Sequence, residues 1–86
     1  MGKHEKFLLK ILSGSSDRNI DFKDLCTFLK QFGFVEYTRG SHHMFRREGI
    51  VEKINLQSDG SNAKPYQVKQ VRNIIQKYGL GDLSNV

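Results

Sequence analysis

The chain has 86 residues, a formal net charge of +5 and a single cysteine, Cys26. A domain of this length buries only about 60% of the surface of its unfolded chain, so any active site should be shallow or shared with a partner. One cysteine excludes an internal disulfide, and neither a long apolar run nor an apolar leader is present. Together these features predict a cytoplasmic protein that does not cross a membrane.

Two amphipathic helices are predicted in the first part of the chain. Apolar residues repeat at helical spacing between residues 7 and 12, which predicts a helix over about residues 4–13. A loop of small residues follows. Asp21 is then a favourable N-cap for a second helix, which Gly33 ends.

The pattern changes from helical spacing to alternation after Gly33. Runs of β-branched and aromatic residues, separated by glycine-containing turns, predict three strands, over residues 34–39, 42–47 and 50–57. The polar residues 58–63 are expected to form a loop. Short connections favour an antiparallel meander of three strands.

The last predicted element is a helix that begins near Pro65, because proline suits the first helical turn, and ends at Gly79. The order α-α-β-β-β-α indicates an α+β fold, with helices covering one face of the sheet. Residues 1–80 are therefore expected to form one domain, followed by a short tail, 81–86.

The adjacent histidines His42 and His43 are predicted to point to opposite faces of the sheet, because neighbouring strand residues do so. If Phe45 lies in the core, His43 leans inward with it and His42 lies on the open face. The reverse arrangement, with Met44 buried, fills a small core less well. The residues expected beside His42 on the open face are Met44, Arg46, Lys53 and Asn55.

A histidine among cations can perform acid–base chemistry on a phosphodiester, since its ordinary pKa of about 6.5 lets it accept and donate a proton. RNA carries its own nucleophile, the 2′-hydroxyl, so cleavage needs no metal in principle. The alternative is that His42 is an ordinary exposed strand residue. No Cys/Asp/His set has the spacing of metal ligands, so neither a metal site nor a cofactor is predicted.

Basic residues accumulate in the C-terminal two thirds of the chain. Lys69 and Arg72 lie three residues apart on the last helix, opposite its apolar stripe, and Lys64 lies at the start of that helix, where N–H groups favour an anion. This face could follow RNA phosphates, or it could be an ordinary solvated helix surface.

Two strings in the sequence resemble the HicA family of toxin mRNA interferases, which have a double-stranded-RNA-binding-domain-like fold. They are Gly-Ser-His-His-Met-Phe at residues 40–45 and Ala-Lys-Pro-Tyr-Gln-Val at residues 63–68. The resemblance covers roughly residues 21–80. Many family members carry Pro-His-Pro after the third strand, whereas this chain has Gln-Ser-Asp-Gly at residues 57–60 and lacks that second histidine.

The resemblance implies a toxin that cleaves mRNA and is inhibited by a HicB-like antitoxin covering the site. His42 would be catalytic, and Gly40 and Ser41 would supply the geometry of the turn. The residues expected to bind RNA are Arg46, Lys53, Lys64, Lys69 and Arg72. Two alternatives stay open: a non-catalytic module that binds double-stranded RNA, and a module that only docks the antitoxin. The added N-terminal helix would cover the core or widen the antitoxin interface.

Overall fold

The computed structural model describes residues 2–80, so the predicted tail 81–86 lies outside the described residues. Its elements follow the predicted order, with one short 3-10 helix and one small hairpin added. They are α1 (Lys3–Ser13), η1 (Asp17–Asn19), α2 (Phe22–Gln31), β1 (Val35–Arg39), β2 (His42–Arg46), β3 (Ile54–Leu56), β4 (Ser58–Asp59), β5 (Asn62–Ala63) and α3 (Pro65–Lys77).

Local sequence signals account for the helix ends. The backbone at Gly14, just after α1, is left-handed with φ of 72°, and its N–H donates to the Ile11 carbonyl. The Asp21 carboxylate accepts the Asp24 N–H at 3.0 Å and caps α2. Pro65 occupies the first turn of α3, where a missing N–H removes no helical hydrogen bond.

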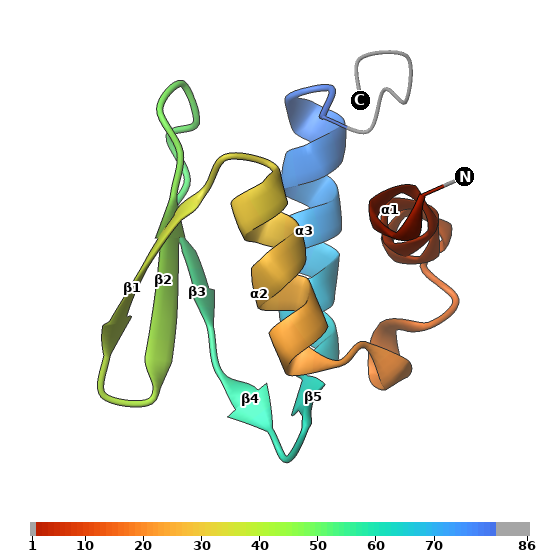
Figure 1. Ribbon diagram of the computed structural model, residues 1–86, viewed down its shortest axis with the longest axis horizontal. Coiled ribbons are helices and arrows are strands. Elements are labelled where there is room, and N and C mark those ends of the chain that lie inside the picture. Colours follow the sequence, from red (N-terminus) through yellow and green to blue (C-terminus); the bar gives the residue numbers. More distant parts are fainter. Residues whose placement is uncertain (1, 81–86) are drawn as a thin grey trace.

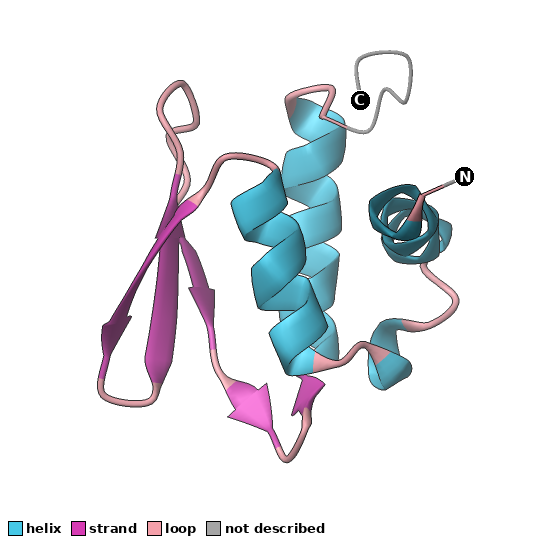
Figure 2. Cartoon of the chain, viewed as in Figure 1, coloured by secondary structure: helices cyan, strands magenta, loops and turns pink. Residues whose placement is uncertain are grey.

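The molecule has three layers (Figure 1). The antiparallel sheet β1-β2-β3 forms the first. Helices α2 and α3 lie side by side on one face of this sheet, and α1 runs across them on the side away from the strands. The opposite face of the sheet carries no helix (Figure 2). The predicted α+β fold, double-stranded-RNA-binding-domain-like and covered on one face, is confirmed.

The core lies between the sheet and the helices. Phe45, Ile54 and Leu56 contribute from the strands, and each is fully buried. The helices contribute the apolar positions that the helical spacing predicts: Leu8, Ile11, Phe22, Leu25, Cys26, Phe28, Leu29, Val68, Val71, Ile74 and Ile75. Leu8 and Ile11 of α1 belong to this cluster, so the N-terminal helix covers the core.

The third strand is shorter than predicted, and the predicted loop is partly a hairpin. Ile50 closes a turn by donating its N–H to the Arg47 carbonyl, but Val51 then donates its N–H to the Tyr78 hydroxyl rather than to β2. Pairing with β2 therefore begins only at Ile54. Residues 58–63 form the β4–β5 hairpin, and Ala63 donates to the Ile20 carbonyl just before α2.

In the described part of the chain, the helices are all too short or too polar to cross a membrane.

Candidate functional site

His42 lies beside the turn between β1 and β2. This turn is a two-residue loop, Gly40-Ser41, between the paired residues Arg39 and His42. Gly40 has φ of 62°, which glycine adopts at little cost and other residues avoid. The loop therefore holds the strands in a register that places His42 at the end of β2, with its side chain exposed on the open face.

The two adjacent histidines point in opposite directions, as the alternation predicts. His43 lies on the core side with Phe45, packs edge-on against Phe22 of α2 with ring centroids 4.9 Å apart, and bonds Glu36. Its side chain is 31% exposed. Since His43 is engaged by the core, the histidine available to a substrate on the open face is His42.

Asn55 of β3 orients the His42 ring. The His42 Nδ1 lies 3.1 Å from the Asn55 Oδ1, and a carbonyl oxygen can only accept a hydrogen bond. Nδ1 therefore donates this hydrogen bond, and in the neutral imidazole Nε2 is then the nitrogen that can accept a proton. Sequence alternation places Asn55 on this face, but only the β2–β3 register brings it to the imidazole.

A chain of side-chain hydrogen bonds connects the turn to the start of α3. The Gln57 amide nitrogen donates to the Ser41 Oγ at 3.1 Å, and the Lys64 ammonium donates to the Gln57 Oε1 at 3.2 Å. The Gln57 backbone N–H donates to the buried side chain of Gln67 at 3.0 Å. Lys64 is thereby fixed near the turn that carries His42. Gln57 is the first residue of the Gln-Ser-Asp-Gly stretch at residues 57–60. The sequence analysis did not predict that it belongs to this site.

Arg39 is a second site residue that sequence reasoning missed. It is paired directly with His42 across the two-residue turn, and both line a shallow hollow with Met44 and Asn55. The signal was present in the sequence, because a two-residue hairpin loop fixes which residues lie opposite each other. Arg39 provides a cation beside His42 at the same end of the sheet.

Arg46 and Lys53 lie on the open face, but toward its other end. Arg46 is four residues from His42 along β2, about 13 Å at the usual rise of a strand. Lys53 directly precedes Ile54, the partner of Phe45, and therefore lies at the same end of the sheet as Arg46. Both side chains are exposed. The structure therefore does not bring these two cations to the same point as His42.

The two predicted cations of α3 differ in their surroundings. Lys69 is exposed. Arg72 donates twice to the Asp17 carboxylate, at 2.9 and 3.1 Å, and once to the Ile11 carbonyl at 3.2 Å, and its side chain is only 14% exposed. Its guanidinium is thus committed to η1 and the end of α1. These contacts support a structural role for Arg72 rather than contact with RNA.

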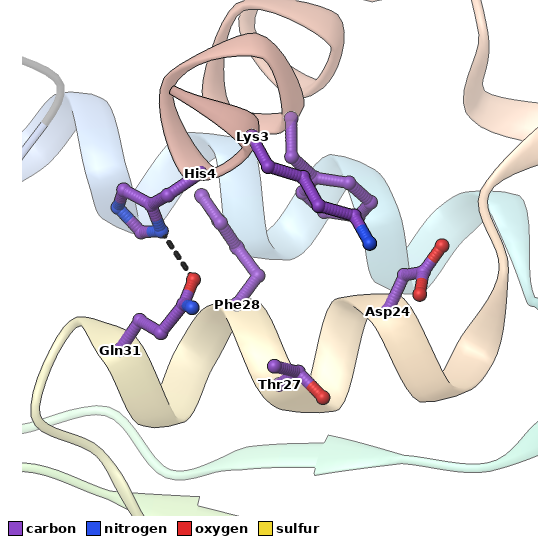
Figure 3. A pocket seen from close by; sticks show the side chains of 7 residues that line it. Lys3, His4, Asp24, Thr27, Phe28 and Gln31 are labelled. Carbon is purple, nitrogen blue, oxygen red and sulfur yellow. Dashed lines mark hydrogen bonds between the residues drawn. The ribbon is translucent and has the colours of Figure 1, made fainter.

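A separate hollow lies between α1 and α2 (Figure 3). Phe7 and Phe28 form part of its lining, and the His4 ring lies at its edge, 2.6 Å from the Gln31 side-chain oxygen. The His4 ring also packs against the rings of Phe28 and Phe32. This hollow lies on the helical side of the molecule and contains no residue of the His42 site.

A comparison with protein families identifies the chain. The model of a family described as "HicA toxin of bacterial toxin-antitoxin" matches residues 22–80, which is more than half of the chain. Searches of curated proteins and of solved structures gave no significant match. The matched region begins at α2, contains the whole sheet and α3, and leaves out α1. The chain therefore belongs to the HicA toxin family of bacterial toxin–antitoxin systems, whose toxins act with an antitoxin partner.

Proposed function

We propose that this toxin is an endoribonuclease that cleaves mRNA in the cytoplasm without a metal ion, with His42 as general acid and base. The observation that carries the proposal is the placement of His42. Its ring is exposed on the open face of the sheet, its Nδ1 is bonded to Asn55, and its Nε2 is left to act on a substrate.

The proposed reaction uses the nucleophile that RNA carries. The His42 Nε2 accepts the proton of a 2′-hydroxyl, and the 2′-oxygen attacks the adjacent phosphorus. The bond from phosphorus to the 5′-oxygen breaks, and the leaving oxygen takes a proton from the imidazolium. The products are a 2′,3′-cyclic phosphate and a 5′-hydroxyl. Arg39 and Lys64 are the cations nearest this end of the sheet, and they would stabilise the negative charge that develops on the phosphoryl oxygens.

The remaining cations suit RNA phosphates away from the bond that is cut. Arg46 and Lys53 lie farther along the sheet than Arg39, so we assign them to a phosphate next to the one at His42. Lys69 is exposed on α3, on the other side of the sheet, so we assign it to a phosphate farther along the RNA. An open face with a shallow hollow suits a long flexible chain, which can lie along the strands.

We further propose that a HicB-like antitoxin inhibits the toxin by covering this face. Val35 and Tyr37 lie on the open side of β1 and are 67% and 44% exposed. Apolar and aromatic side chains exposed beside cations are typical of surfaces that bind another protein. An antitoxin bound here would cover His42 and exclude RNA.

The experiment that tests the function is cleavage of a defined oligoribonucleotide by the purified protein in EDTA. We expect cleavage in EDTA, products ending in a 2′,3′-cyclic phosphate, and no cleavage when a 2′-deoxy nucleotide replaces the one before the cut. Cleavage of the 2′-deoxy substrate would contradict the mechanism. Binding of duplex RNA without cleavage would favour a binding module, and inertness toward RNA with antitoxin binding would favour a docking module.

A further inference from the structure

We propose that Cys26, Glu36 and His43 form a zinc-binding site on the core side of the sheet, directly behind the strand that carries His42. Cys26 comes from α2, Glu36 from β1 and His43 from β2. One potential ligand atom of each residue lies within 4.8 Å of the others. Among residues 2–80, this is the one group of three such side chains so placed. This site is independent of the proposed RNA cleavage.

The donor set fits zinc better than other common ions. Thiolate, imidazole and carboxylate together are ligands of Zn²⁺, whereas Mg²⁺ and Ca²⁺ take oxygen ligands. In a tetrahedral zinc site, donor atoms lie about 3.5 Å apart, as bond lengths of about 2.0–2.3 Å require. Glu36 and His43 approach to 2.8 Å through a hydrogen bond, which is closer than two ligands of one ion, so this bond must open for the ion to enter. All three ligand atoms already lie within 4.8 Å of one another, so the movements needed are small.

The site can be reached from solvent. Cys26, Glu36 and His43 line a hollow between α2 and the strands, together with Phe22, Lys23, Thr27 and Lys30. The side chains of His43 and Glu36 are 31% and 17% exposed. Three protein ligands leave room for a water molecule as the fourth, and the hollow provides its space.

Three changes accompany binding of the ion. The hydrogen bond between His43 and Glu36 opens, and any proton on the ring nitrogen that binds the ion passes to solvent. The Lys30 ammonium lies 2.7 Å from the Glu36 carboxylate and keeps the pKa of that carboxyl below its usual value. Lys30 is 53% exposed, so it can move into water when the ion takes its place. Burial raises the pKa of the Cys26 thiol to about 11, with Glu36 adding to the effect, so the thiol is protonated before binding. Binding breaks the S–H bond, forms the Zn–S bond and releases the proton to solvent.

Sequence spacing did not reveal this set. Its residues come from three different elements and are spaced ten and seven residues apart, whereas the familiar zinc motifs place paired ligands only a few residues apart. Bound there, the ion would connect α2 to β1 and β2 and would hold His43 in place. It would thus stabilise the sheet from its core side without contacting RNA. Removing the ion with EDTA should therefore lower the melting temperature but leave RNA cleavage intact at temperatures where the protein stays folded.

The test is a cobalt and zinc titration of the purified chain, with any affinity tag removed. A cobalt–thiolate absorption band can come only from Cys26, because the chain has no other cysteine. We expect this band at one cobalt per monomer, its loss on adding zinc, and a melting temperature that rises with zinc concentration. Glu36→Gln and His43→Gln should weaken binding at least tenfold, and Cys26→Ser should abolish the band. His4→Gln should bind as the wild type does.

Several results would overturn the site. They are the absence of a cobalt–thiolate band in the folded wild-type chain, an equal zinc-dependent rise in melting temperature for Cys26→Ser and wild type, and formation of dimers in step with metal binding. Since His43 and Cys26 pack in the core, circular dichroism without metal checks that each variant folds. If Cys26→Ser and His43→Gln do not fold, two tests of the zinc site remain. They are the titration of the wild-type chain and that of Glu36→Gln, which changes a residue at the margin of the core.

Discussion

Two neighbouring histidines of one strand have different surroundings, and those surroundings separate their roles. His42 is exposed and bonded to Asn55, whereas His43 bonds Glu36 and packs against Phe22. Alternation along β2 predicted which histidine faces outward. It could not predict their partners, because Asn55 and Glu36 come from other strands and reach the rings only through the sheet register.

Replacing Asn55 by alanine should slow cleavage without preventing folding. The variant loses the acceptor that keeps the proton on the His42 Nδ1. A hydrogen bond with a net worth of about 1 kcal/mol corresponds to a rate lower by roughly fivefold. Single-turnover rates at saturating protein would measure this. An unchanged rate would show that Asn55 does not position the ring.

Replacing His43 by alanine should lower stability rather than remove the chemistry. The change removes a hydrogen bond and an edge-on aromatic contact at the core, and we expect a loss of about 1–3 kcal/mol in the free energy of unfolding. Urea unfolding measures the loss, and cleavage at low temperature should persist. A variant that is fully stable yet inactive would identify His43, rather than His42, as the catalytic histidine.

At the scale of elements, the helices and the first two strands could be predicted from sequence, but the bounds of the elements in residues 50–63 could not. Caps and periodicity are local signals, so Asp21, Pro65 and the glycines mark helix ends correctly. The shortening of β3 depends on the Tyr78 hydroxyl, which comes from the far end of α3 and captures the Val51 N–H. The helical spacing of Arg72 likewise predicts a polar face but not its partner, Asp17.

Arg72 should be important for stability and not for RNA binding. It joins α3 to η1 and the end of α1 through three hydrogen bonds, two of them to a carboxylate. Arg72→Ala leaves Asp17 without this partner, and we expect a loss of about 2 kcal/mol in the free energy of unfolding. Urea unfolding measures this. Wild-type stability combined with weakened RNA binding would return Arg72 to the RNA-binding set.

The contact between the β2–β3 connection and the end of α3 should depend on pH. Lys77 and then Tyr78 hold the pKa of Glu52 at about 2, below its unfolded value of about 4.3. A lowered carboxyl pKa contributes stability above the unfolded pKa, and that contribution is lost as pH falls toward about 2. Glu52→Gln should therefore be less stable than wild type near neutral pH, and the difference should disappear near pH 2. Urea unfolding of both proteins near neutral pH and near pH 2 measures this difference in the free energy of unfolding.

At the scale of the whole molecule, the layered arrangement leaves one face of the sheet for function. The N-terminal helix lies on the side of α2 and α3 away from the strands (Figure 1), and the acidic Asp17 is bonded to Arg72 of α3. The exposed cations Arg39, Arg46 and Lys53 lie on or beside the strands, and Lys69 lies on α3. The strands of this small domain therefore offer a basic, open surface, which suits both a polyanion and a protein that caps it.

This distribution predicts how salt should affect RNA binding. Each phosphate neutralised in single-stranded RNA contributes a slope of about 0.7 in log affinity against log salt. Lys69→Ala should lower the slope by about that amount. Lys6→Ala removes the same charge from exposed α1 and should leave the slope unchanged. Equal effects of the two variants would indicate that only net charge matters, and that α3 does not contact RNA.

The central claim is that His42 carries out the chemistry, and the most direct measurement is the single-turnover cleavage rate of His42→Ala against wild type. Both proteins are compared on one oligoribonucleotide in EDTA, with RNA affinity and folding measured in parallel. Removing a general acid and base should lower the rate by roughly 10²–10⁴-fold while the variant stays folded and still binds RNA. Equal rates for the two proteins would contradict the account.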